Sequence, residues 1–198
     1  MIPVCSHAAQ VQVLDNGITL VVEENHSAPV ASVRVYANVG SVYEGEYLGA
    51  GISHFIEHCA SEGTPSRSKQ EIDRAMEALG NDANAYTTDD HTCYYVNTAA
   101  TYAEDAAELV LDYVLHPNFP MNAVDTQRGI IQREIARGDD EPGRRIHNLF
   151  KRTIFRKHPA RHRTIGYEEQ FNTVQRADLL SFHSRTYVPE NIICVAVG

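Results

Sequence analysis

The sequence has only four cysteines among its 198 residues, and no two of them form a C-x-x-C pair. They are scattered along the chain as Cys5, Cys59, Cys93 and Cys194. This spacing argues against a dense disulfide framework, and we expect reduced thiols that fill apolar positions.

Long apolar runs are missing as well. No stretch approaches the roughly 20 consecutive apolar residues of a membrane-spanning helix. The N-terminus also lacks the basic region followed by an apolar run that is typical of a signal peptide. We therefore expect a cytoplasmic protein with no membrane partner.

Positive charge is scarce, because 17 Lys and Arg stand against 26 Asp and Glu, which gives a net charge of −9. This balance argues against a nucleic-acid or anionic-membrane partner and is mildly compatible with cationic peptides. The length and the hydrophobic content of 43% are those of one soluble globular domain over residues 1–198. No internal repeat, linker or low-complexity segment divides it.

Turn signals and hydrophobic periodicity predict the secondary structure. Ser66 or Ser68 is expected to cap the second helix, and Thr101 with Glu104 to form a capping box on the third. The long helix is expected to break at residues 138–143. We expect strands at 10–14, 18–24, 30–39, two within 81–96 and one at 192–197. We expect helices from about 51 to a stop near 63–65, from a cap at 66 or 68 through 79, from 101 to about 115, and at about 122–137, 144–155 and 174–187. The order predicts an α+β fold, with a mixed, mostly antiparallel sheet covered by helices.

The stretch around the first helix carries the strongest chemical signal. On a helix its residues divide into an apolar stripe and an opposite polar face with His54, Glu57 and His58. Two imidazoles one turn apart are spaced to bind one tetrahedral zinc ion, and Glu57 could reach a water there. The pattern is H-x-x-E-H, the inverted order of the zincin motif. The stripe consists of Ile52, Phe55, Ile56 and Cys59.

A plainer interpretation has to be weighed, because polar residues opposite an apolar stripe usually form only a solvated face. In a chain with 10 histidines, H-x-x-E-H arises by chance in about four of a hundred sequences of this length. The motif therefore needs a third ligand. For Cys59, on the apolar stripe, core packing is favoured over metal ligation.

Glu134 is the candidate third ligand. It lies at the edge of the apolar face that Ile130, Ile131 and Ile135 give to the long helix. Partial burial of an ionised carboxylate at such an edge costs free energy unless the carboxylate is paired or bound to a metal. A partly exposed glutamate or an ion pair with a nearby arginine remains the alternative.

Four segments together resemble the pitrilysin/insulinase family of inverted zincins, which includes mitochondrial processing peptidase and insulin-degrading enzymes. The likeness covers essentially the whole chain, and Glu134 follows His58 at the distance that the family would give it. The segments are residues 51–64, with the H-x-x-E-H motif and Glu62-Gly63-Thr64; residues 80–95, with Asn84-Ala85-Tyr86-Thr87; residues 128–135; and residues 158–191, with His158-Pro159, Ile165-Gly166 and Tyr187 to Asn191.

The resemblance implies a zinc endopeptidase. His54, His58 and Glu134 would bind zinc, and Glu57 would be the general base on a zinc-bound water and then the general acid. Because the ligands must be deprotonated, activity should fall in acid.

The resemblance also implies how a substrate binds. An extended or unfolded peptide would pair with the edge strand that contains Asn84, Ala85 and Tyr86. For Tyr94 and Tyr95, packing on the sheet is favoured over a role in substrate binding.

This chain departs from the family pattern in two places. Gln127 stands where the family commonly has a second glutamate, which removes a charge beside the metal ligands and is expected to weaken zinc retention or catalysis. A basic segment follows Pro159 in place of a small residue and glycine; its His162 is not expected to bind metal.

Family members are usually built from paired domains of this size. We therefore expect the N-terminal half of a larger or two-subunit enzyme, with weak or no peptidase activity alone and a second homologous domain or subunit as its partner. The alternative is a non-catalytic peptide-binding or assembly domain of the same family.

Overall fold

A computed structural model describes residues 8–198, so that Cys5 lies outside the described part. Six strands form one sheet in the order β1-β2-β6-β3-β5-β4. Every neighbouring pair is antiparallel except β2 with β6. The prediction of a mixed, mostly antiparallel sheet is therefore confirmed. The strands are β1 (Gln10–Val13), β2 (Thr19–Glu23), β3 (Val30–Ala37), β4 (Asp82–Thr87), β5 (Thr92–Ala99) and β6 (Ile192–Val197).

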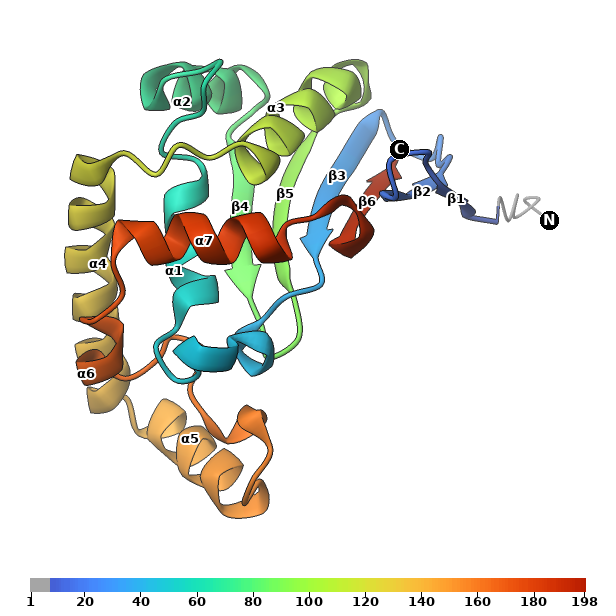
Figure 1. Ribbon diagram of the computed structural model, residues 1–198. Coiled ribbons are helices and arrows are strands. Elements are labelled where there is room, and N and C mark those ends of the chain that lie inside the picture. Colours follow the sequence, from blue (N-terminus) through green and yellow to red (C-terminus); the bar gives the residue numbers. More distant parts are fainter. Residues whose placement is uncertain (1–7) are drawn as a thin grey trace.

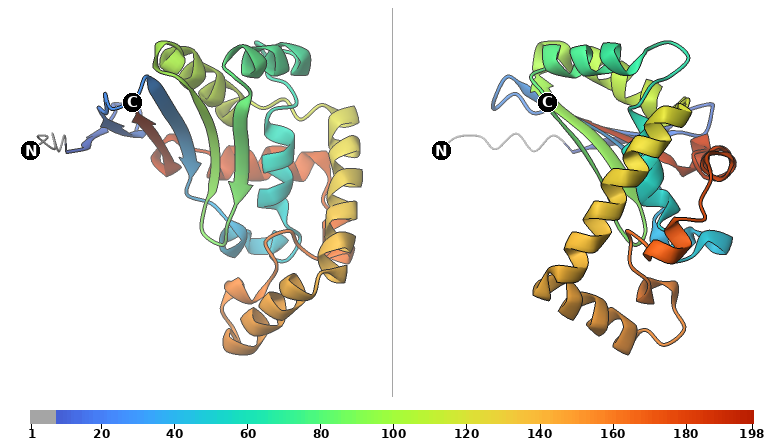
Figure 2. Two further views of the ribbon diagram at one scale, coloured as in Figure 1. Left: turned by 180° about the vertical axis from the view of Figure 1, so that it is seen from behind. Right: turned by 90° about the vertical axis from the view of Figure 1, so that its left-hand side faces the viewer.

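Helices pack on one face of this sheet, beside its β4 edge and past its end. They are α1 (Ile52–Ala60), α2 (Lys69–Ala78), α3 (Ala103–Leu115), α4 (Met121–Asp140), α5 (Pro142–Ile154), α6 (Glu168–Phe171) and α7 (Arg176–Thr186). Figure 1 shows α1, α3 and α7 over the sheet, with α1 beside β4, and α4 standing beyond the β4 edge. Helix α5 projects past the end of the sheet, as the views in Figure 2 agree.

The core lies between the sheet and these helices. Alternate residues of β3, from Ala31 to Ala37, are buried, which matches the period-2 pattern of a strand with one covered face. The apolar stripe predicted for the first helix is confirmed. Its members Ile52, Phe55, Ile56 and Cys59 have no exposed surface. Burial raises the pKa of the Cys59 thiol to about 12, as expected of a core residue rather than a metal ligand.

Three helix boundaries differ from the prediction. Helix α1 ends at Ala60, before the predicted stop at 63–65. Helix α4 continues through Gly138, and only Glu141, with an extended backbone, separates it from α5. Pro142 begins α5, where its missing N–H costs no hydrogen bond. The helix predicted at 174–187 begins at Arg176, and a separate short helix, α6, precedes it.

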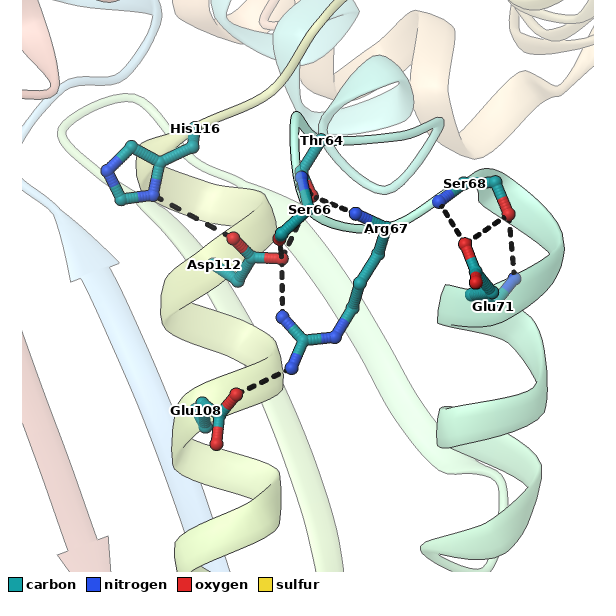
Figure 3. Close-up of polar contacts among 8 residues, drawn as sticks. All are labelled: Thr64, Ser66, Arg67, Ser68, Glu71, Glu108, Asp112 and His116. Carbon is teal, nitrogen blue, oxygen red and sulfur yellow. Dashed lines mark hydrogen bonds and ion pairs between the residues drawn. The ribbon is translucent and has the colours of Figure 1, made fainter.

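Polar contacts fasten the loop after α1 to α3 (Figure 3). Asp112 accepts hydrogen bonds from Arg67 at 2.7 Å, Ser66 at 2.8 Å and Thr64 at 2.9 Å. Burial raises the pKa of Asp112, but these bonds outweigh it and lower the pKa overall. The loop that leaves the end of α1 is therefore held in one place.

The predicted caps had different outcomes. Ser68 caps α2 and forms a reciprocal capping box with Glu71, also drawn in Figure 3. The capping box predicted for Thr101 is wrong, because Tyr102 is the N-cap of α3 and no side chain caps it. A short 3-10 turn at Ala100–Tyr102 leads into the helix instead.

No helix within residues 8–198 combines the length and the apolarity needed to cross a bilayer.

Candidate metal centre

Helix α1 begins without the serine, threonine or asparagine that usually caps a helix. Its N-cap is Gly51, in the left-handed region at φ +69°. Glu44, only 1% exposed, accepts hydrogen bonds from the backbone N–H groups of Gly51 at 3.2 Å and Ser53 at 3.0 Å. A buried carboxylate therefore satisfies donors that the first turn leaves free. Burial raises the pKa of Glu44 to about 8, although these hydrogen bonds lower it.

Gly51 also permits two backbones to meet. A Cβ atom there would overlap the carbonyl group of Ile165, and one at Gly166 would overlap the carbonyl group of Ala50. Only glycine allows this approach together with the positive φ of Gly51. The two glycines thus bring the loop before α6 against the start of α1.

Gly51→Ala is expected to lower the free energy of unfolding by about 3 kcal/mol or more, because the new methyl group adds a backbone clash to the cost of a positive φ. The matched control is Gly45→Ala, since Gly45 has φ +58° but open space around its Cβ position. That variant should lose only about 1–2 kcal/mol. Urea unfolding monitored by circular dichroism measures both. Equal losses would contradict the close approach.

The side chains of His54, His58 and Glu134 converge where α1 faces α4. Glu134 Oε2 is 3.9 Å from His54 Nε2 and 3.7 Å from His58 Nε2. The two imidazole rings have centroids 4.6 Å apart. One donor atom from each residue can be chosen so that all three lie within 4.8 Å of one another. Residues 76 positions apart along the chain thus form one cluster.

These donors suit a zinc ion. Bonds of about 2.0–2.2 Å in tetrahedral geometry separate neighbouring ligand atoms by about 3.3–3.5 Å, slightly less than the 3.7 and 3.9 Å between Glu134 and the two imidazoles. Burial, followed by the charge of His58, lowers the pKa of His54 to about 3, so that this imidazole is neutral at neutral pH as a metal ligand must be. Glu134 also lies 3.8 Å from Arg144 on α5, so the arginine pair considered as its alternative is present as a loose contact.

Glu57 lies beside the cluster on the same helix. Its Oε2 accepts a hydrogen bond from the Thr87 hydroxyl at the end of β4. Burial raises the pKa of Glu57, and the nearby charge of Glu134 raises it further, while the bond from Thr87 lowers it. A carboxyl group with a raised pKa that is held by one hydrogen bond is suited to take up and release a proton.

Two hollows flank the cluster. One, of about 350 Å³, is lined by Glu57, His58, Ala85 and Tyr94 among others. The other, of about 410 Å³, is lined by His54, Thr87, Glu134, Arg144 and His147 among others. The cluster is therefore open to a ligand on both sides.

The predicted substrate residues lie on β4, the last strand of the sheet, which has a neighbour on only one side. Asn84 is exposed, and its side chain accepts a hydrogen bond from the N–H of Ala85 at 2.8 Å. Ala85 lines the hollow beside Glu57. Tyr86 packs its ring against His91 with centroids 5.7 Å apart. β4 thus brings these three residues to the edge nearest α1.

The two tyrosines of β5 pack on the sheet, as predicted. Tyr94 is 1% exposed, and its hydroxyl lies 2.9 Å from the hydroxyl of Tyr187. Arg34 covers the ring of Tyr95 at 4.7 Å from its centroid.

Gln127 and His162 have different environments. Gln127 lies on α4, and its Oε1 is 3.1 Å from His58 Nδ1, so it does adjoin a candidate ligand. His162 packs against Tyr167 with ring centroids 5.9 Å apart, outside the His54 cluster.

Sequence reasoning missed the side chains that support the cluster. Glu44 stands seven residues before Gly51, the N-cap of the helix, where no local capping pattern points to it. Thr87 lies in a segment that the sequence marks as a strand, but its bond to Glu57 depends on how β4 meets α1. Glu62, in the loop after α1, contacts Gln127 on α4 only because the fold brings these distant segments together.

The chain is similar to several known proteins. The model of the insulinase family, peptidase family M16, matches residues 19–168. An uncharacterized zinc protease of Mycobacterium tuberculosis is 36% identical over 196 residues, which cover 99% of this chain and 44% of the relative. Cytochrome b-c1 complex subunit 1 of Bos taurus is 31% identical over 189 residues, which cover 96% and 39%.

Solved structures show the same fold. A protease from Helicobacter pylori matches with a TM-score of 0.90 and 26% identity, over 96% of this chain and 46% of that one. A peptidase M16 inactive domain from Pseudomonas fluorescens matches with a TM-score of 0.87 and 20% identity, over 96% and 46%. The chain spans less than half the length of these relatives. Because the family model matches more than half of the residues, the chain belongs to the insulinase family, peptidase family M16.

Proposed function

We propose that this chain is the zinc-binding half of a metalloendopeptidase that hydrolyses extended peptides. The observation that carries the proposal is the convergence of two imidazoles and one carboxylate beside a second carboxylate, that of Glu57. Relatives named zinc proteases support the choice of metal.

His54, His58 and Glu134 would hold the ion. A zinc ion bound there would supply Lewis-acid chemistry, for the scissile carbonyl and for a water molecule. The Glu57 carboxylate takes the proton of the attacking water and passes it to the leaving amine. Thr87 holds the Glu57 carboxylate in place through its hydroxyl.

The substrate peptide would lie along β4 as an added strand. β4 is at the end of the sheet and runs past Glu57, so main-chain pairing would bring a peptide bond to the cluster. The N–H of Ala85, which the Asn84 side chain covers, would have to be released for that pairing. Because backbone atoms provide most of the contacts, we expect broad sequence tolerance and a requirement for unfolded substrate.

A second homologous domain or subunit is proposed as the partner. This chain matches only 39–44% of the length of relatives such as those above. Helix α5, next to the cluster, exposes four large apolar side chains to between 50% and 69%, as a surface covered in a larger assembly would; they are Ile146, Leu149, Phe150 and Ile154. On this proposal the present residues form the N-terminal half.

Hydrolysis of an unfolded, fluorescently labelled peptide tests the proposal. The zinc-loaded chain should cleave it slowly, faster when a homologous second half is added, and not at all after treatment with a chelator. Cleavage that persists unchanged without metal would rule the proposal out.

The second candidate is a non-catalytic assembly or peptide-binding domain. Similarity to a cytochrome b-c1 complex subunit and to a structure titled an inactive domain favours it. Zinc that binds tightly, with no turnover even in the presence of the second half, would support this candidate over the peptidase.

A further inference from the structure

The candidate metal ligand His58 is the first of three side chains that are joined by hydrogen-bond contacts. Gln127, on α4, lies between His58 on α1 and Glu62 in the loop that follows α1. Its Oε1 is 3.1 Å from His58 Nδ1, and its Nε2 donates to Glu62 Oε1 at 2.9 Å. All three side chains are partly buried.

The chemistry of these groups fixes the direction of each hydrogen bond. An ionised carboxylate only accepts, so the NH₂ group of Gln127 has to face Glu62. The amide oxygen then faces His58, and an oxygen requires a donor, which makes Nδ1 the protonated nitrogen. A neutral imidazole carries one N–H, so Nε2 keeps its free lone pair. That Nε2 lies 3.7 Å from Glu134.

We propose that Glu62 is a positioning residue that, through Gln127, holds His58 in the Nδ1–H tautomer and turns its Nε2 lone pair toward the metal. The inference deepens the proposed function and rests on it. Glu62 is not one of the three clustered side chains, although it lines the hollow beside Glu57, and it acts by setting the orientation of the amide.

The contact with Gln127 orients His58 but not His54. His54 Nδ1 is buried and has no hydrogen-bond partner within the described residues. His54 is therefore oriented by packing, whereas His58, with 22% of its side chain exposed, is oriented by the Gln127 contact. Loss of Glu62 should consequently affect His58 and leave His54 unchanged.

The hydrogen bond between Gln127 and Glu62 also explains why glutamine suits position 127 in this chain. A glutamate there would put two carboxylates at the 2.9 Å separation now bridged by an N–H. One partner has to be an amide and the other a carboxylate. Exchanging them, with Glu62→Gln and Gln127→Glu together, keeps an acceptor facing His58 and a hydrogen bond between the two positions.

Two measurements test the role proposed for Glu62, and one of them needs no metal. Nitrogen-15 NMR of the metal-free protein reports the tautomer of each histidine, and competition with a chelator gives the zinc dissociation constant. In Glu62→Gln the amide of Gln127 is free to flip, so His58 should show mixed tautomers and zinc should bind about 10–100-fold more weakly. The double exchange should restore both. Glu77→Gln, at an exposed glutamate of α2, is the matched control and should change neither.

The proposal is overturned if Glu62→Gln leaves the His58 tautomer unchanged, or if the double exchange is no better than the single variants. Its failure differs from that of the proposed function. If His58→Ala did not weaken zinc binding, the metal site would be wrong, while the NMR of the metal-free protein would still decide the role of Glu62.

Discussion

Glu57→Gln is expected to lower the rate of peptide hydrolysis at least about 10²–10⁴-fold while zinc remains bound. Glutamine has nearly the same shape and keeps a hydrogen bond with Thr87, but it cannot take a proton from water. Because Glu57 is not among the three clustered ligands, the metal should stay. Turnover of an unfolded peptide by the zinc-loaded protein, with the second half present, is the measurement.

Glu77→Gln on α2 provides the control for this variant, because it removes an exposed carboxylate that is not part of the cluster and should leave turnover unchanged. Hydrolysis by Glu57→Gln at the rate of the unmodified protein would exclude Glu57 as the general base.

Glu134→Ala is expected to weaken zinc binding on the order of a thousandfold, because it removes one of three protein ligands. Loss of a residue that only hydrogen-bonds to a ligand typically weakens metal binding about 10–100-fold. The fold should survive, since the Glu134 side chain is 31% exposed and the buried side of α4 is formed by other residues. Competition with a chelator of known affinity measures the change.

Glu141→Ala is the matched control for this second variant. Glu141 lines the same hollow as Glu134 and pairs with Arg144 at 2.9 Å, but it is not part of the ligand cluster. Its removal should change zinc affinity little. Equal losses in the two variants would indicate a general effect of negative charge rather than ligation by Glu134.

Much of this architecture could be predicted from the sequence because it depends on local periodicity. The apolar stripe of α1, the alternation along β3 and the Ser68 cap are patterns within a few residues, and the structure confirms each. The H-x-x-E-H motif placed both imidazoles on one helical face for the same reason.

The rest depends on contacts between distant segments. That Glu134 meets the imidazoles across two helices came from the resemblance to the family, not from the residues themselves. The Glu44 cap, the approach of Gly166 to Gly51 and the contact of Glu62 with Gln127 have no local sequence pattern. Helix α4 runs through Gly138 without interruption, although glycine has a low helix propensity, so this residue alone does not mark the end of the helix.

X-ray absorption at the zinc edge of the protein loaded with one equivalent of metal tests the central claim most directly. We expect nitrogen and oxygen neighbours at about 2.0–2.2 Å, with the imidazole scattering of two histidines, and loss of one histidine signal in His58→Ala. Sulfur at about 2.3 Å, or a spectrum that His58→Ala leaves unchanged, would show that the metal binds elsewhere and would contradict the account.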